Sequence, residues 1–300
     1  MKGVARSHRL ATYACIDIGS NTTRLLVAET GPGTLRELMT QRVFTRIGKG
    51  LRKTKHLAPE KVAEVAEVVA TQARHAHELG AERIEVVATA AIRDADNRTD
   101  LLDAINARAG LPTKVLSDSE EARLAFLGAS RSLGSAVDGS LAVVDVGGGS
   151  SEIAVGSMDE GVSWCESFRI GSGYLAESYL HSDPPSVEEL ENVRRHAAGV
   201  LDGLRVPPVD RAVAVGGSAA SLRRIAGAEL AHEPLERAIR VLASAPSEEI
   251  AERFELDVER VRLLPAGVLI LEAISDCLGM PLKVAGGGLR EGVIIEMATG

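Results

Sequence analysis

Apolar residues in this chain recur with two different spacings, one typical of helices and one typical of strands. From residue 60 to 79 they recur every three or four positions, which predicts an amphipathic helix that Gly80 ends. Residues 84–91 form a short β-branched run instead, which predicts a buried strand. The alternation continues, with a short strand expected at 114–116 and helices at 99–109, 120–127, 187–204, 219–225, 247–254 and 258–278. An α/β fold is therefore expected.

One pattern occurs twice. Residues 14–27 (ACIDIGSNTTRLLV) and 142–155 (AVVDVGGGSSEIAV) align without a gap, with Asp17 on Asp145 and Gly19 on Gly147. Each copy is an apolar run, a turn of small residues and a second apolar run, as in a β-hairpin with a tight turn. The repeat predicts two equivalent domains that face each other, at 1–133 and 134–300, with a linker at 134–140. The C-terminal helix is a candidate to pack back on the first domain.

Composition narrows the class of protein. Hydrophobic residues make up 45% and charged residues 25% of the 300 positions, as in globular proteins. The sequence has no uncharged apolar run of membrane-spanning length, and its start, up to Thr12, is basic and polar, so we expect a cytoplasmic protein without a secretory signal or membrane partner. Cys15, Cys165 and Cys277 show no C-x-x-C spacing, which argues against a zinc site and suggests small core residues.

Charge is distributed unevenly. The net charge of −8 argues against a polyanionic partner, and no nucleic acid is expected to bind. Residues 36–55, however, contain seven basic residues against the single acid Glu37. Such a run is often only a solvated surface. This one also contains Gly48 and Gly50, which suggests a loop that approaches phosphate.

Four glycine-rich turns follow apolar runs, at 19–23, 147–151, 216–218 and 286–288. One such turn is usually structural, but four together favour phosphate binding, because free backbone N–H groups and helix N-termini attract anions. Asp17 and Asp145 each precede a turn at the end of an apolar run, where an unpaired carboxylate is costly to bury. Mg²⁺ bound by these carboxylates and by phosphate oxygens would neutralise their charge. Alternatively, each aspartate caps its own hairpin turn.

Other candidate catalytic and binding residues lie in less specific patterns. The sequence contains no P-loop motif and no G-x-S-x-G motif, and its histidines are scattered. Glu120 and Glu121 lie at the start of a helix that Ser119 can cap, where acids stabilise the helix dipole whether or not they are catalytic. Arg93 follows a strand end, where ligands of open α/β sheets bind. From its residues alone, the chain is predicted to be a two-lobed, metal-dependent phosphate-binding protein.

Seven segments together resemble the exopolyphosphatase and guanosine pentaphosphate phosphohydrolase family of the actin-like ATPase superfamily. They are DIGSNTTRLLV (17–27), FTRIGKGL (44–51), ATAAIRDADN (88–97), SEEARLAFLG (119–128), VVDVGGGSSEIAVG (143–156), VGGSAASL (215–222) and GGGLREGVI (286–294). This resemblance implies two ribonuclease H-like domains with an active site in the cleft between them. It also implies hydrolysis of a terminal phosphoryl group that the two hairpin turns hold.

The resemblance implies a role for individual residues. Glu121 corresponds to the base that deprotonates the attacking water, Asp145 and Glu152 to the acidic pair linked to Mg²⁺, and Asp17 to the aspartate of the first domain. Mn²⁺ is an alternative metal, and a monovalent cation such as K⁺ a further candidate. The positions expected to contact phosphate are Asn21, Thr22, Arg46, Lys49, Arg93, Gly147, Gly148, Gly149, Ser150, Gly216, Gly217 and Ser218.

The sequence departs from the family pattern in two places. Asp118 stands where a glycine is frequent, and an added acid beside the base can raise its pKa or repel substrate. The sequence ends at Gly300 without the helical extension of long members, so the short, two-domain form is expected.

The expected activity is removal of orthophosphate from the end of inorganic polyphosphate. Hydrolysis of guanosine pentaphosphate, a non-catalytic alarmone or polyphosphate sensor, and a kinase of the same superfamily remain alternatives. The acidic residues Glu121, Asp145 and Glu152 argue against a sensor, because a pure binder needs no base. A homodimer is expected on general grounds.

Overall fold

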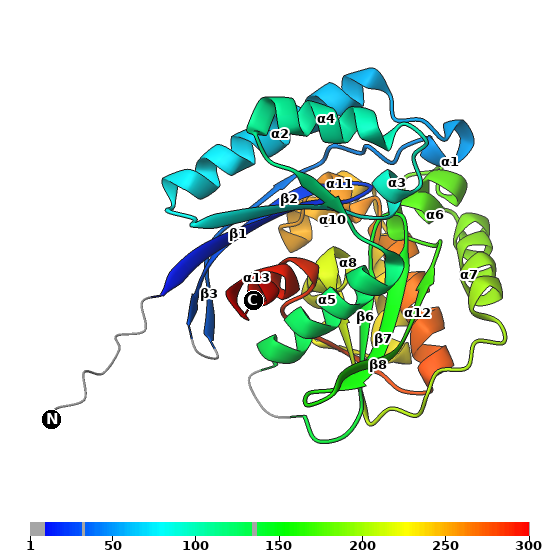
Figure 1. Cartoon of the computed structure of the whole chain (residues 1–300). Helices are drawn as coiled ribbons and strands as arrows, with labels where there is room; N and C mark the ends of the chain where they lie inside the picture. Colours follow the sequence, from blue (N-terminus) through cyan, green and yellow to red (C-terminus); the bar gives the residue numbers. More distant parts are fainter. Residues whose placement is uncertain (1–9, 32–33, 134–136, 300) are drawn as a thin grey trace, which may run out of the picture.

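The computed structural model describes residues 10–31, 34–133 and 137–299, and the first part of the chain forms a five-stranded sheet (Figure 1). Its strands lie in the order β3 (Thr34–Val43), β2 (Thr23–Gly31), β1 (Ala11–Ile18), β4 (Arg83–Ala88) and β5 (Thr113–Val115). Helices α2 (Pro59–Glu78) and α4 (Arg98–Ala109) pack together on one face of the sheet. Gly80 follows α2 in the left-handed conformation, which confirms the predicted helix end.

The second part of the chain forms a six-stranded sheet. The strand order is β10 (Glu229–Leu230), β11 (Leu282–Val284), β9 (Arg211–Val215), β6 (Leu141–Val146), β7 (Ser151–Ser157) and β8 (Gly161–Phe168). The helices of this part are α6 (Ser172–Tyr179), α7 (Val187–Leu201), α8 (Gly216–Ala226), α9 (His232–Leu242), α10 (Ser247–Phe254), α11 (Val258–Val261) and α12 (Leu264–Leu278). Buried α12 packs against α6, α7, α8 and α9 in the largest hydrophobic core.

The repeat forms the same hairpin in both sheets. Strand β1 pairs with β2 and β6 pairs with β7, both antiparallel. In each turn a glycine N–H donates to a carbonyl three residues later, from Gly19 to Thr22 and from Gly147 to Ser150, both at 3.0 Å. The α/β class is thus confirmed, and each of the two sheets carries one copy of the repeat.

Two helices lie side by side between the sheets (Figure 1). Helix α5 (Asp118–Ser132) packs on β6, β7 and β8, whereas the C-terminal α13 (Leu289–Thr299) packs on β1 and β2. The two helices touch at glycines, because a Cβ on Gly128 would collide with the Gly288 backbone and one on Gly292 with the Leu124 backbone. The predicted domain boundary after residue 133 adjoins 134–136, outside the described residues, and stays a prediction.

Several element ends differ from the sequence prediction. Ser117, not Ser119, caps α5, because Ser117 pairs reciprocally with Glu120 in a capping box and Ser119 lies inside the helix. The helix expected at 258–278 is two helices, with Pro265 in the first turn of the second. The turn at 216–218 is itself the first turn of α8. No helix in the described part of the chain is long and apolar enough to cross a membrane.

Candidate active site

The two hairpin turns meet at a small cavity, which we call the central chamber. Its volume is about 60 Å³. A Cβ on Gly148 would lie 2.6 Å from Nδ2 of Asn21, so the glycine allows the turns to approach each other. The chamber brings together most of the predicted residues: Asp17, Asn21, Thr22, Glu121, Asp145, Gly147, Gly148, Gly149, Ser150, Glu152 and Gly217.

The first hairpin contributes an ion pair. Asp17 is buried, and Nη2 of Arg24, its partner across the β1–β2 pair, donates to its Oδ2 at 2.9 Å. Oδ1 of Asp17 is buried and has no hydrogen-bond partner in the described part of the chain. Asp17 therefore accepts from Arg24 rather than capping its own turn, and one oxygen remains available for another ligand.

The second hairpin contributes two carboxylates. Asp145 and Glu152 face each other in the β6–β7 register, at the positions that Asp17 and Arg24 occupy in the first hairpin. Burial raises the pKa of Asp145, while burial and the charge of Asp145 raise the pKa of Glu152 to about 7. Ser167 donates to Oε1 of Glu152 at 2.8 Å. A cation beside this pair would favour its ionised form.

A metal ion here would need ligands besides protein side chains. Within the described ranges, no group of three or more His, Cys, Asp or Glu side chains is arranged to hold an ion. Magnesium is commonly bound by one or two carboxylates, with water and substrate phosphate completing its shell. Asp145 and Glu152, which face each other at the chamber, supply the two carboxylates of that mode of binding.

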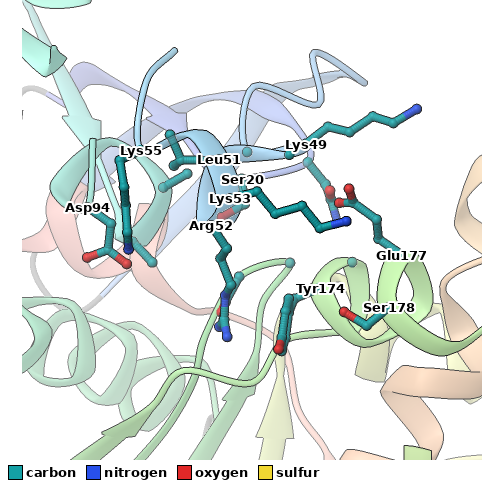
Figure 2. A pocket seen from close by; sticks show the side chains of 18 of the residues that line it. Ser20, Lys49, Leu51, Arg52, Lys53, Lys55, Asp94, Tyr174, Glu177 and Ser178 are labelled. Atoms are coloured by element: carbon teal, nitrogen blue, oxygen red, sulfur yellow. The ribbon is translucent and has the colours of Figure 1, made fainter. Parts of the chain in front are cut away.

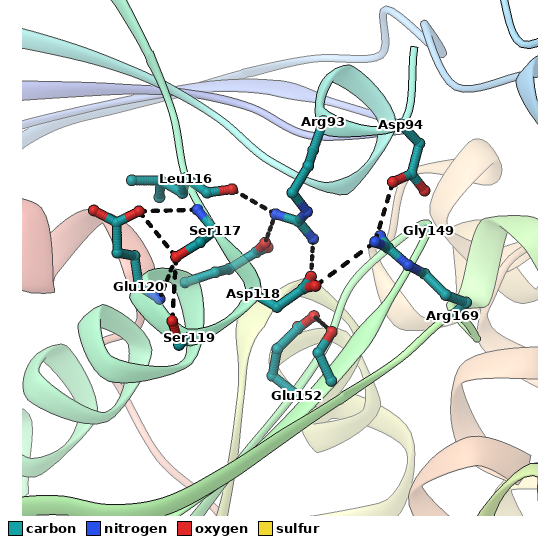
Figure 3. Close-up of polar contacts among 12 residues, drawn as sticks. Arg93, Asp94, Leu116, Ser117, Asp118, Ser119, Glu120, Gly149, Glu152 and Arg169 are labelled. Carbon is teal, nitrogen blue, oxygen red and sulfur yellow. Dashed lines mark hydrogen bonds and ion pairs between the residues drawn. The ribbon is translucent and has the colours of Figure 1, made fainter. Parts of the chain in front are cut away.

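Glu121 enters the chamber from the first turn of α5. Nη1 of Arg93 lies 3.1 Å from its Oε2 and 2.7 Å from the Leu116 carbonyl oxygen (Figure 3). Burial raises the pKa of Glu121 well above its ordinary value, and Glu152 adds to this rise while Arg93 opposes it. A carboxylate with a raised pKa accepts protons more readily, as a general base must.

Asp118 pairs with two arginines. Its carboxylate pairs with Arg93 and, at 3.6 Å, with Arg169, which also pairs with Asp94 at 3.1 Å (Figure 3). Two guanidinium groups thus offset the charge that the sequence suggested would disturb Glu121. Arg93, predicted to contact phosphate, donates its hydrogen bonds to Glu121, Asp118 and Leu116.

Four other predicted residues lie around the chamber. Lys49 lines a neighbouring cavity, and Arg46 pairs with Glu259 of α11. Gly216 has a φ of 80° and packs against the Asp145 carboxylate. Buried Ser218 donates to the Val146 carbonyl at 3.1 Å and so fixes the end of β6.

Sequence reasoning missed two arginines of the chamber, Arg24 and Arg260. Arg260 is only 6% exposed, and its Nε has no hydrogen-bond partner among the described residues. Burial, followed by the charges of Arg42 and Arg24, lowers the pKa of Arg260 to about 10. A buried cation without a carboxylate partner is suited to an anionic ligand. Arg24 was accessible from the sequence, because the repeat aligns it with Glu152.

A sequence model of the Ppx/GppA phosphatase family matches residues 26–299. The chain belongs to this family. Exopolyphosphatase 2 of Mycobacterium tuberculosis is 36% identical over 239 residues, covering 75% of this chain and 73% of that protein. Membership of the Ppx/GppA family confirms the predicted resemblance and the predicted class, a phosphohydrolase.

Solved Ppx/GppA structures agree with the fold. A family member from Aquifex aeolicus is 28% identical and superposes with a TM-score of 0.81, covering 97% of this chain and 98% of that one. An exopolyphosphatase from Cytophaga hutchinsonii is 20% identical, with a TM-score of 0.85 and coverage of 96% and 98%, and shows the shared fold.

Proposed function

We propose that this Ppx/GppA member is an exopolyphosphatase that removes orthophosphate from the end of inorganic polyphosphate. The main observation is that Glu121 lies in a chamber of about 60 Å³ between the two hairpin turns. That space suits one terminal phosphoryl group and a water molecule. The similarity of this chain to exopolyphosphatase 2 of M. tuberculosis supports polyphosphate as the substrate class.

A basic cavity leads to the chamber and favours a polyanion. This front pocket has a volume of about 490 Å³ and shares Ser20, Asn21, Gly148 and Gly149 with the chamber. Figure 2 shows the basic side chains that line it, all from residues 49–55, a segment that includes helix α1 (Leu51–Thr54): Lys49, Arg52, Lys53 and Lys55. Asp94 and Glu177 are its acids, so the lining carries a net positive charge. The rest of the phosphate chain would lie here.

Catalysis would depend on position and charge. The backbone of the two turns would hold the terminal phosphoryl group, and Arg260 would offset its charge. Glu121 would take a proton from water as the water oxygen bonds to phosphorus and the bond to the bridging oxygen breaks. The shortened polyphosphate keeps the bridging oxygen and its electron pair.

Asp145 and Glu152 would hold Mg²⁺ or Mn²⁺, with Asp17 lining the same chamber. The ion would supply Lewis acid charge neutralisation at the phosphoryl oxygens. A monovalent cation such as K⁺ has no assigned ligands in this proposal.

Guanosine pentaphosphate is the second candidate substrate, because it presents the same terminal group. A guanine base would need a stacking surface, and Tyr174 in the front pocket offers one. The Arg52 guanidinium lies 3.3 Å from the centroid of the Tyr174 ring and covers it (Figure 2). This contact favours polyphosphate over the nucleotide.

Phosphate release from long-chain polyphosphate and from guanosine pentaphosphate, with Mg²⁺, tests the proposal. Glu121→Gln should lose at least about a hundredfold in kcat on polyphosphate, because its amide cannot accept the proton. Glu120→Gln is the matched control, since glutamine can still complete the capping box and activity should remain. Turnover of the nucleotide alone would favour the second substrate. Tight binding without turnover would instead favour a sensor.

A further inference from the structure

Three cavities adjoin one another through shared lining residues. The central chamber shares residues with the front pocket on one side and with a third cavity, the rear pocket, on the other. The rear pocket measures about 690 Å³ and shares Arg24, Asp145, Gly217, Arg260 and Leu289 with the chamber. The front and rear pockets share no lining residue. The chamber therefore has a neighbouring cavity at each of two separate sides.

The two outer pockets differ in charge. The front pocket is lined by four lysine and arginine side chains against two acids, whereas five arginines and five acids line the rear pocket. A polyanionic chain is attracted to the side with excess positive charge. The rear pocket is balanced overall, yet it places Arg260 and Arg290 near the chamber wall, and neither makes an ion pair with a described carboxylate. Such a surface can accept a small anion without holding it tightly.

Release of orthophosphate is a separate step in the cycle of an exopolyphosphatase. After cleavage, orthophosphate lies in the chamber while the shortened chain still fills the front pocket. Orthophosphate can return through the front pocket only if the chain first leaves. A second opening would let the small product leave while the chain stays and advances by one phosphate.

We propose that the rear pocket is the exit site for orthophosphate, with Arg260 and Arg290 as its first anion contacts outside the chamber. This inference rests on the proposed function and adds a direction to it. The chain enters through the front pocket, and the product leaves at the opposite side. Repeated cleavage without release of the chain follows from this arrangement.

Bulky side chains placed in each outer pocket test where the chain enters and where orthophosphate leaves. Gly286→Trp and Ala220→Trp would obstruct the rear pocket. Both residues are exposed, and a Cβ on Gly286 would meet no atom within 4 Å, so the larger side chains should not disturb the fold. Ser178→Trp is the matched obstruction in the front pocket. Rapid-quench measurement of total phosphate reports cleavage, and a fluorescent phosphate sensor reports release.

The expected result differs for the two sides. With long-chain polyphosphate, at least one rear variant should cleave the first bond at the wild-type rate but release phosphate about tenfold more slowly, giving a burst of bound product. The defect should shrink with tripolyphosphate, whose short remainder dissociates and opens the front route. Ser178→Trp should lower kcat/KM without a burst.

Three results would overturn the exit site. One is wild-type release by both rear variants on long chains, and another is slowed release in Ser178→Trp alone. A rear-variant defect that is equally large with tripolyphosphate is the third. Wild-type protein that cleaves no polyphosphate in the quench assay would instead refute the proposed function.

Discussion

Arg93 contacts Glu121, and this contact limits how far burial raises the pKa of Glu121. Burial and Glu152 raise the pKa of Glu121, while Arg93 lowers it through its charge and its hydrogen bond. Arg93 also joins Glu121 to the Leu116 carbonyl and so fixes the carboxylate relative to the end of β5. We therefore treat Arg93 as a positioning residue for the base.

Replacing Arg93 by Gln should raise the pKa of Glu121 further. Because Glu121 acts in its ionised form, the acidic limb of kcat/KM against pH should move to higher pH. Activity near neutral pH should fall about tenfold or more, since the carboxylate is also less well placed. Arg83→Gln, in an exposed arginine at the other end of β4, is the control. An acidic limb that does not move in Arg93→Gln would contradict the assigned role.

Single residues were predictable from the sequence where a local pattern constrained them. Asp17 and Asp145 precede glycine turns at the ends of apolar runs, and both line the chamber. Arg260 has no such signal, because its burial arises from long-range contacts with the Gly217 turn and Phe44. Charged residues alternate with apolar ones around Arg260, as they do in a solvated helix.

Helix α5 depends on its first turn for both stability and the placement of Glu121. The Ser117 hydroxyl accepts from the Glu120 N–H at 3.2 Å, and the Glu120 carboxylate accepts from the Ser117 N–H at 2.9 Å. The hydrogen bond from the Ser117 N–H and the ion pair with Lys114 lower the pKa of Glu120 to about 2, so its charged form persists over the range in which the protein would function.

Ser117→Ala should lower the free energy of unfolding by about 1 kcal/mol, the usual cost of a lost N-cap. Ser119→Ala, two residues inside the helix, should change the free energy of unfolding by less than about 0.5 kcal/mol. Urea denaturation of the two variants measures the difference. Equal losses would mean that the capping box does not stabilise α5.

The crossing of α5 and α13 requires residues without side chains. Gly292→Ala would press a methyl group into the Leu124 backbone, so we expect a loss of about 1–3 kcal/mol in the free energy of unfolding. Gly199→Ala in α7 has open space at the same atom and should stabilise the protein by about 0.5–1 kcal/mol. Thermal unfolding should thus shift in opposite directions, and a stable Gly292→Ala variant would refute the close contact.

The sequence predicted which segments form helices and strands better than it predicted where those helices and strands end. The long helix at 60–79 and both hairpins follow from local periodicity, and the structure has them at nearly those residues. The break between α11 and α12 was missed, because apolar residues continue across it at helical spacing. The position of α13 against β1 depends on contacts between opposite ends of the chain, which periodicity does not report.

At the scale of the molecule, the repeat predicted two facing lobes, and side chains of the basic segment 46–55 join them. Arg46 pairs with Glu259, and Arg52 donates to the Gly149 carbonyl at 3.3 Å and stacks on Tyr174 of α6. The segment that would receive the phosphate chain is thus already in contact with the second lobe. Its placement there was not accessible from charge alone.

Ionic strength should therefore affect long substrates most. Salt screens the positive front pocket, so kcat/KM for long-chain polyphosphate should fall more steeply with added KCl than kcat/KM for tripolyphosphate, which places fewer charges outside the chamber. Steady-state rates at several salt concentrations measure the two slopes. Parallel slopes would argue against a chain-binding role for the front pocket.

Arg24 of the first hairpin occupies the position that Glu152 occupies in the second. The two hairpins are copies of one sequence pattern, and they differ in charge at this position. A symmetric pair would present the same field to both sides of a tetrahedral anion and could not distinguish its oxygens. With the Asp17–Arg24 ion pair on one side and the Asp145 and Glu152 carboxylates on the other, the chamber has an electrical polarity, which would favour one orientation of a phosphoryl group bound there.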